Sequence, residues 1–154
     1  MRAPLESEVA IRRALPHDAP FIRELSVVAF GEYDPNAARA TAHMMLEVGA
    51  QTLLAERNGT PLGFVILYAQ SPADLAINAI AVSPSERGKR IGQRLMQAAE
   101  HHAKAHDFTR ITLSTAQANL AALDLFLRSG FTITTRDTRY WRNQPACKLE
   151  KRIA

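Results

Sequence analysis

The chain has 154 residues, of which 47% are hydrophobic and 22% charged, with a formal net charge of +4 at pH 7. This length and composition predict a single domain over residues 1–154 with a core of its own. One cysteine excludes an internal disulfide, and no signal peptide or membrane-spanning apolar run is found. We therefore expect a cytoplasmic protein that does not contact a membrane.

The first half of the chain predicts, in order, a strand, two helices and a β-hairpin. Asp18 is placed to cap the first helix, in which Phe21, Leu25 and Val28 recur on one face. Asn58-Gly59 predicts the hairpin turn, because both residues tolerate positive φ. These elements are expected at residues 9–15, 19–30, 38–48, 52–57 and 62–70.

The second half of the chain predicts strands and helices that alternate. An apolar strand ends at Val82, and a proline, a basic turn and an amphipathic helix follow it. A strand, a helix and a strand over this length predict a right-handed parallel crossover, whereas the preceding strands pair antiparallel. The expected elements cover residues 75–82, 92–106, 111–114, 119–129, 131–136 and 147–151.

The stretch from residue 77 to residue 95 carries the clearest functional pattern. A helix start leaves backbone N–H groups unpaired and has roughly half a positive charge. Basic side chains gather at this start, and they are Arg87, Lys89, Arg90 and Arg94. The pattern predicts a phosphate-binding site, and the alternative is a tight turn before a helix with a solvated basic face. A P-loop is excluded because no Gly-Lys-Ser/Thr follows a first glycine at the needed distance, and a dinucleotide fingerprint is excluded because its third glycine and the partner acid after a second strand are missing.

Two segments resemble the GNAT N-acetyltransferase superfamily. Arg87-Gly88-Lys89-Arg90-Ile91-Gly92 is similar to its acetyl-CoA loop, usually written Arg/Gln-x-x-Gly-x-Gly/Ala, although Arg90 replaces the middle glycine. The strand end Ile80-Ala81-Val82 and the following Ser83-Pro84 also resemble the family, and so do residues 119–131, which end in Gly-Phe. The resemblance covers most of the chain.

This resemblance implies an α+β fold and a site for acetyl-CoA as cosubstrate. The expected sheet is mixed, mostly antiparallel, of about seven strands, with helices on both faces and a V-shaped splay between strands four and five. In the family a bulge near the end of the fourth strand points N–H groups at the cosubstrate. The implied cosubstrate-binding residues are Ile80, Ala81, Val82, Arg87, Gly88, Lys89, Arg90, Ile91, Gly92, Asn119 and Phe126. A plain buried strand for residues 80–82 and a helix N-cap for Asn119 are the simpler interpretations.

Catalytic groups are less clearly marked. Acetyl transfer requires an unprotonated amine, and a general base and a general acid can assist. The family commonly has a carboxylate late in the fourth strand and a Tyr in the last helix, where this chain has Asn78 and Phe126. Asn78 and Glu32 are retained as candidate catalytic residues, with Asp34 beside Glu32. A satisfied amide for Asn78 and a solvated turn for the two acids are the alternatives.

The leading hypothesis is a transferase, an acetyl-CoA-dependent N-acetyltransferase that acts on a primary amine of a small molecule or a protein N-terminus. The amine would attack directly in a ternary complex. The alternative is a non-catalytic acyl-CoA sensor of the same fold. Nucleic-acid binding is disfavoured despite a pI of about 9.6, because no aromatic residues alternate with the basic ones. No metal site is expected, since His102 and His106 lack a third ligand, and a homodimer is expected by analogy only.

Overall fold

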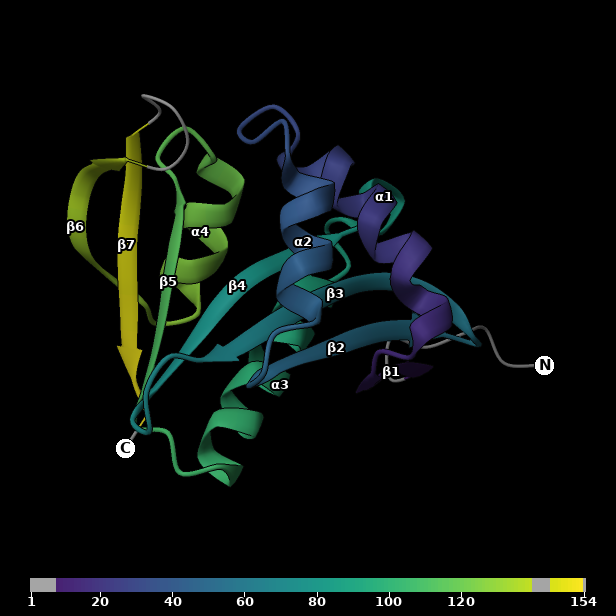
Figure 1. The fold of residues 1–154 in the computed structure, drawn as a ribbon, viewed down its shortest axis with the longest axis horizontal. Helices are drawn as coiled ribbons and strands as arrows, with labels where there is room; N and C mark the ends of the chain where they lie inside the picture. Colours follow the sequence, from purple (N-terminus) through teal and green to yellow (C-terminus); the bar gives the residue numbers. More distant parts are fainter. Residues whose placement is uncertain (1–7, 140–144, 154) are drawn as a thin grey trace.

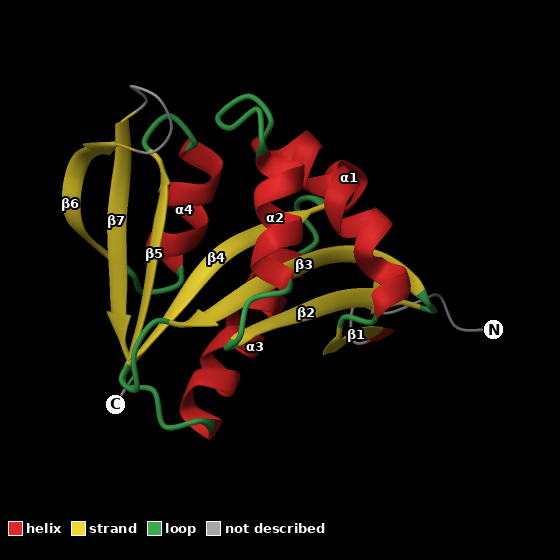
Figure 2. Cartoon of the chain, viewed as in Figure 1, coloured by secondary structure: helices red, strands yellow, loops and turns green. Residues whose placement is uncertain are grey.

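The computed structural model describes residues 8–139 and 145–153. Within them the chain forms one seven-stranded mixed sheet, of order β1-β2-β3-β4-β5-β7-β6 (Figures 1 and 2). The strands are β1 (Val9–Arg13), β2 (Ala50–Arg57), β3 (Thr60–Ala69), β4 (Asp74–Val82), β5 (Arg110–Ala116), β6 (Thr132–Arg139) and β7 (Pro145–Arg152). The helices are α1 (Ala19–Phe30), α2 (Ala37–Met45), α3 (Ile91–Ala105) and α4 (Leu120–Arg128), with short 3-10 turns at Pro16–Asp18 and Pro84–Glu86. The expected α+β class and strand number are confirmed.

Helices cover both faces of the sheet and enclose two apolar cores. The alternation of side chains along β3 builds both: Val65 and Leu67 pack with α3 and α4, whereas Phe64 and Ile66 pack with α1. This explains why β3 is apolar at successive positions. In Figure 1, α1 and α2 lie in front of the sheet and α3 behind it.

The sheet opens between β4 and β5. These parallel strands pair only from Asp74 to Ile77, opposite Arg110 to Leu113. Beyond that point β4 continues beside β3, whereas β5 continues beside β7. The expected splay between strands four and five is therefore confirmed.

A β-bulge marks the point where the two strands separate. Ile77 pairs with Leu67 and Ala79 with Ile66, so Asn78 is the extra residue of β4. The expected bulge near the end of the fourth strand is therefore present, and residues 80–82, whose N–H groups the resemblance assigns to the cosubstrate, follow it and pair regularly with β3. An extra residue increases strand twist, and at Asn78 it turns β4 away from β5 where their pairing ends.

Several local expectations are confirmed and others are corrected. Asn58 and Gly59 have φ of 51° and 81° in the β2–β3 turn. The second helix ends at Met45 and not at residue 48, because Leu46 and Val48 are exposed and have no core to pack against. Across the described residues, no helix combines the length and hydrophobicity that a bilayer crossing needs.

Asp18 stands at the N-cap position of α1, as the sequence predicted, but its side chain makes no cap bond to the helix. Its buried carboxylate accepts hydrogen bonds from both guanidinium nitrogens Nη1 and Nη2 of Arg12, at 2.7 and 3.0 Å, and from the N–H of Leu15 at 2.7 Å. The Arg12 guanidinium holds the pKa of Asp18 below its usual range despite burial. Asp18 thus ties the turn before α1 to the edge strand β1.

Candidate active site

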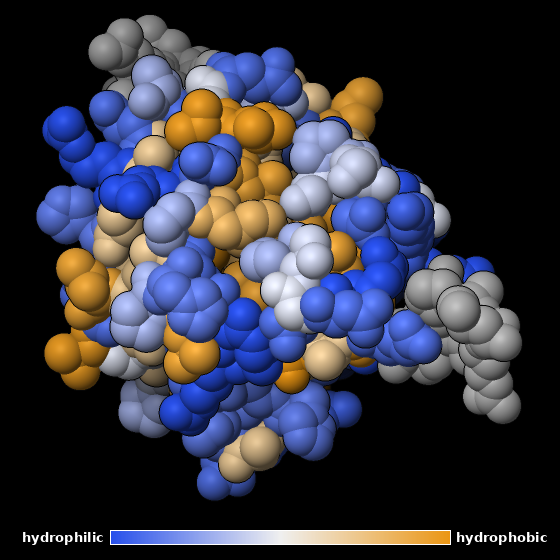
Figure 3. Space-filling model, turned by 90° about the vertical axis from the view of Figure 1, so that its right-hand side faces the viewer, coloured by the Kyte–Doolittle hydropathy of each residue, from blue (hydrophilic) through white to orange (hydrophobic). Residues whose placement is uncertain are grey.

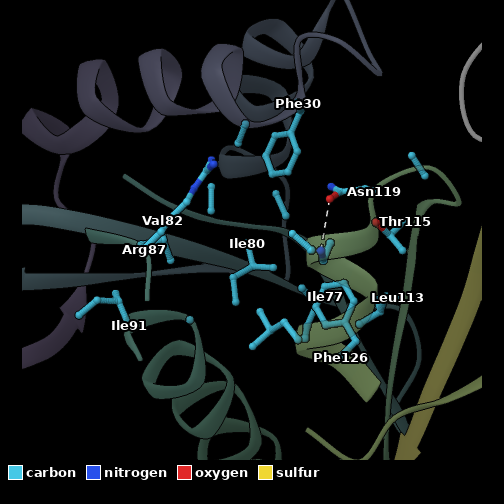
Figure 4. A pocket seen from close by; sticks show the side chains of 18 of the residues that line it. Phe30, Ile77, Ile80, Val82, Arg87, Ile91, Leu113, Thr115, Asn119 and Phe126 are labelled. Atoms are coloured by element: carbon cyan, nitrogen blue, oxygen red, sulfur yellow. Dashed lines mark hydrogen bonds between the residues drawn. The ribbon is translucent and has the colours of Figure 1, made fainter. Parts of the chain in front are cut away.

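A cleft of about 770 Å³ occupies the opening between β4 and β5. Its walls come from the end of α1, from β4 and β5, from the loop and first turn of α3, and from α4. In Figure 4 the apolar side chains of Ile77, Ile80 and Phe126 lie between β4 and α4. The opening of the sheet therefore leaves a ligand-sized space inside the fold and not a bare sheet edge.

Apolar residues continue onto the surface around this cleft. Val28 on α1 is 60% exposed and Leu120 on α4 is 73% exposed, and both line the cleft. Figure 3 shows a continuous apolar area near the upper centre of this face, among hydrophilic residues, and smaller apolar areas at its left side. Exposed apolar side chains beside a hollow are typical of a ligand-binding groove.

Unpaired backbone amides lie at the start of α3. The first hydrogen bond of this helix runs from the N–H of Arg94 to the carbonyl oxygen of Arg90, at 3.1 Å. Among the described residues, no acceptor bonds the amides of Ile91, Gly92 and Gln93, and all three residues line the cleft. The helix therefore presents three N–H donors and its positive dipole end to the cleft.

The loop before α3 relies on left-handed backbone. Gly88 has φ of 79° and Arg90 has φ of 64°, a conformation that favours glycine. This explains why the resembled motif has glycine where Arg90 stands. A Cβ on Gly88 would have no heavy atom within 4 Å, whereas one on Gly92 would lie 3.3 Å from Cδ2 of Leu125. Gly92 thus permits the close approach of α3 to α4.

Only two of the four expected cations line the cleft, namely Arg87 and Arg90. Lys89 lies outside the lining and is 3.5 Å from the carboxylate of Glu86. Arg94 donates a hydrogen bond to the carbonyl oxygen of Val9 at 2.9 Å and so has a structural role. The sequence gives the number of charges at a helix start but not their directions.

Glu86 holds the loop in place. Its carboxylate accepts a hydrogen bond from Nη1 of Arg57 at 2.8 Å, across from the β2–β3 hairpin. The pKa of Glu86 is lowered first by this bond and further by Lys89. The loop therefore carries a carboxylate that is already paired, which leaves the charge of Arg87 available to a ligand.

The free edge of β4 forms a second wall of the cleft. Ile80, Ala81 and Val82 all line it, and β4 has no partner strand on its β5 side after Ile77. Backbone groups on that side need partners when water is excluded. The expected backbone wall is therefore present, although its strand is regular at these residues.

Asn119, at the start of α4, is consistent with both interpretations. Its Oδ1 accepts a hydrogen bond from the N–H of Ala122 at 3.2 Å, which is an N-cap bond (dashed in Figure 4). Asn119 also lines the cleft, as does Phe126. Phe126 is buried, its ring lies 6.1 Å from that of Phe131, and it has no proton to donate.

The two candidate catalytic residues lie on different elements. Asn78 is exposed at the bulge, and Glu32 lines the cleft from the segment after α1. Tyr33 and Ser114 also line the cleft, and sequence reasoning missed both. Tyr33 follows Glu32 in a segment that the sequence analysis had already singled out, and this position could have identified it as a lining residue. Tyr140, which could not be placed from sequence, lies outside the described residues.

Metal ligands do not gather in the part of the chain that the structure describes. No three side chains of His, Cys, Asp or Glu come close enough there to hold an ion. His102 and His106 stack with ring centroids 4.3 Å apart, and burial lowers the pKa of His102. This pair packs and does not join either cavity.

A second cavity, of about 630 Å³, lies on the α2 side of the sheet. The two cavities share the lining residues Phe30, Ile77, Asn78, Ala79, Leu113 and Ser114. They therefore meet at the gap where β4 leaves β5. The same six residues therefore border ligands in either cavity.

Comparisons with known proteins agree with this geometry. The family model "Acetyltransferase (GNAT) family" matches residues 16–131. Mycothiol acetyltransferase of Thermobispora bispora is 34% identical over 95 residues, which are 58% of this chain and 32% of that protein. L-2,4-diaminobutyric acid acetyltransferase of Nocardia farcinica is 30% identical over 95 residues, 60% of this chain and 49% of that protein. The chain thus spans about a third to a half of the length of these curated relatives.

Solved structures resemble the whole chain. Ard1 from Thermoplasma volcanium has a TM-score of 0.82 at 20% identity, over 96% of this chain and 99% of that one. A GNAT family acetyltransferase from Elizabethkingia anophelis, solved with acetyl-CoA bound, has a TM-score of 0.73 at 20% identity, over 94% of this chain and 98% of that one. At such identities the likeness shows the fold.

Proposed function

Because the chain belongs to the acetyltransferase (GNAT) family, we propose that it is an acetyl-CoA-dependent N-acetyltransferase. It transfers the acetyl group to a primary amine of a small molecule or a protein N-terminus. The observation that carries this proposal is the start of α3, where three unpaired amides and Arg87 border a cleft that leads to the β4–β5 gap.

The residues present fit acetyl-CoA. Its diphosphate would bind the amides of residues 91–93, with Arg87 and Arg90 beside it, because a helix start binds anions through its N–H groups and dipole. Its pantetheine arm contains amides, which suit the unpaired backbone edge of β4 along residues 80–82. Gly88 leaves open space where a side chain would stand, so the loop can approach the phosphates closely.

The proposed reaction occurs at the gap between the two cavities. The neutral amine attacks the thioester carbonyl carbon, the new C–N bond forms, the C–S bond breaks, and the amine loses a proton. Coenzyme A leaves as a thiolate, which is stable without an acid because thiols have a pKa near 8.5. Phe126 therefore does not prevent the reaction, although it supplies no proton.

A titration of acetyl-CoA into the protein, followed by a thiol-release assay over a panel of amines, tests the proposal. We expect binding, a raised melting temperature and amine-dependent release of coenzyme A. The absence of binding to acetyl-CoA or coenzyme A would overturn it. Binding without turnover on any amine would instead favour the non-catalytic sensor. Phe126 and Asn78, which supply neither an acid nor a base, are also consistent with such a sensor.

Two further features remain predictions. We expect the protein in the cytoplasm, where acetyl-CoA is available to it, and as a possible homodimer. Cell fractionation tests the first, and size-exclusion chromatography with light scattering tests the second.

A further inference from the structure

The second cavity has a different chemistry from the cleft. Its walls come from α2 and the segment before it, and from β4, β5, β6 and β7. Polar and charged side chains together outnumber the apolar ones in it, and its hydroxyl and amide groups come from Thr41, Gln70, Asn78, Thr112, Ser114 and Thr134. Such a lining suits a polar molecule of small size.

Most charges of this cavity are paired with one another. Arg110 donates two hydrogen bonds to the carboxylate of Asp74, both at 2.9 Å, and a third to Glu150 at 3.2 Å. The Arg110 guanidinium accordingly lowers the pKa of Asp74. These three groups form a network at the end of the cavity where β4 and β5 are still paired, and they leave no free cation for a ligand, because one guanidinium serves two carboxylates.

Two charges of opposite sign remain, Asp34 and Lys148. Asp34 lies before α2, and its carboxylate accepts only the N–H of Asn36, at 2.9 Å, among the described residues. Lys148 lies on β7, is exposed, and forms no ion pair with any described residue. Both line the cavity, one from the helical layer and one from the sheet.

The sheet register puts Lys148 near the gap. Ser114 of β5 is the direct partner of Lys148, and Leu113 is the partner of Ile77, the residue before Asn78. Lys148 is therefore one strand spacing, about 5 Å, from Ser114, which lines both cavities together with Asn78.

On the basis of the proposed function, we infer that the acceptor is a small amino carboxylate, with its carboxylate bound by Lys148 and its amine at the gap beside Asn78. Asp34 attracts the ammonium form into the cavity. Simple amines and diamines would leave Lys148 without a partner. A protein N-terminus would bring no carboxylate to this position, so it is disfavoured as the acceptor class.

Matched acceptor pairs test the inference. Thiol release with acetyl-CoA is measured for L-ornithine against putrescine and for L-alanine against ethylamine, which differ by the carboxylate. We expect kcat/KM to favour the amino acid by about tenfold or more in at least one pair, the scale of one charge-assisted hydrogen bond. Lys148→Met should remove this preference by raising KM for the amino acid far more than for the amine.

Lys104→Met is the matched control, because Lys104 is an exposed lysine on α3 and lines neither cavity. It should leave the preference intact. Equal use of both members of each pair, or an equal loss for both in Lys148→Met, would overturn the inference while the proposed function stands. Failure to bind acetyl-CoA would instead overturn the proposed function.

Calorimetry provides a readout that does not depend on turnover. The same amino acids are titrated into the protein saturated with coenzyme A, and Lys148→Met should weaken their binding about tenfold, the scale of one charge-assisted hydrogen bond. If neither amino acid is acetylated and neither binds, the inference is wrong.

Discussion

The two cavities that meet at the β4–β5 gap differ in the groups they present. The cleft offers backbone N–H groups at the start of α3, a backbone edge on β4 and apolar side chains. The second cavity offers hydroxyls, amides and charged side chains. Recognition by backbone depends on the fold and tolerates a change such as Arg90 in place of glycine, whereas recognition by side chains depends on the residues of this chain. The cosubstrate can therefore be inferred from the fold, whereas the acceptor must be inferred from the individual side chains of this chain.

The largest expected effect comes from Gly92→Leu. A Cβ at this position already lies 3.3 Å from Leu125, so a larger side chain must separate α3 from α4 or cover the amides of the first turn. We expect acetyl-CoA affinity to fall more than about 100-fold, or roughly 3 kcal/mol. Calorimetry measures it, with circular dichroism to verify folding.

Gly92→Ala is the control for this prediction. Leu125 has a flexible side chain end that can move by a few tenths of an ångström, so binding should weaken far less. Unchanged affinity in a folded Gly92→Leu variant would show that the start of α3 does not hold the cosubstrate.

The next effect is the dependence of kcat/KM for the acceptor on pH. The gap residues Asn78 and Ser114 are uncharged, so the acceptor amine loses its proton to solvent unless Glu32 acts as a base. A lysine-like amine has a pKa near 10.4, and below it the neutral fraction rises about tenfold per pH unit. We expect kcat/KM for such an acceptor to rise in step from pH 6 to 9, whereas acetyl-CoA binding changes little. A plateau near pH 7 would reveal a general base, for which Glu32 is the first variant to make.

Arg87→Ala tests which of the basic side chains near the start of α3 contributes to acetyl-CoA binding. Arg87 lines the cleft, whereas Lys89 is beside Glu86 and outside the lining. We expect Arg87→Ala to weaken acetyl-CoA binding about tenfold, which is about 1.4 kcal/mol. Lys89→Ala should change it less than about threefold, since exposed ion pairs contribute about 0–1 kcal/mol. Equal effects in calorimetry would contradict the assignment of these two charges.

The smallest effect is expected from Arg90→Gly. Arg90 has φ of 64°, and a non-glycine residue in left-handed backbone costs about 1 kcal/mol or somewhat more. The variant should unfold at a higher denaturant concentration, with binding lowered only slightly by the lost cation. A large loss of affinity would mean that the side chain, and not the backbone, holds the phosphates.

Local patterns predicted much of the fold. Asn58-Gly59 gave the hairpin, and the apolar spacing of residues gave the helices, because both depend on backbone preference and on burial of one face. Asp18 is at the predicted N-cap position, but its carboxylate bonds Arg12 on another element and not the helix amides, which no local pattern indicates. The exact residue of the bulge, Asn78, also could not be predicted, because pairing with β3 and loss of pairing with β5 together decide where an extra residue fits.

The elements, their order and the helix start that we propose binds an anion could be predicted from sequence, because these follow from short-range spacing and backbone geometry. Contacts in the folded chain determine that Arg94 bonds Val9 while Arg87 lines the cleft, and that Ser114 and Lys148 are paired beside the gap. Side-chain direction and strand register depend on contacts between residues far apart in the chain. For this reason the cosubstrate could be predicted from a motif, and the acceptor could not.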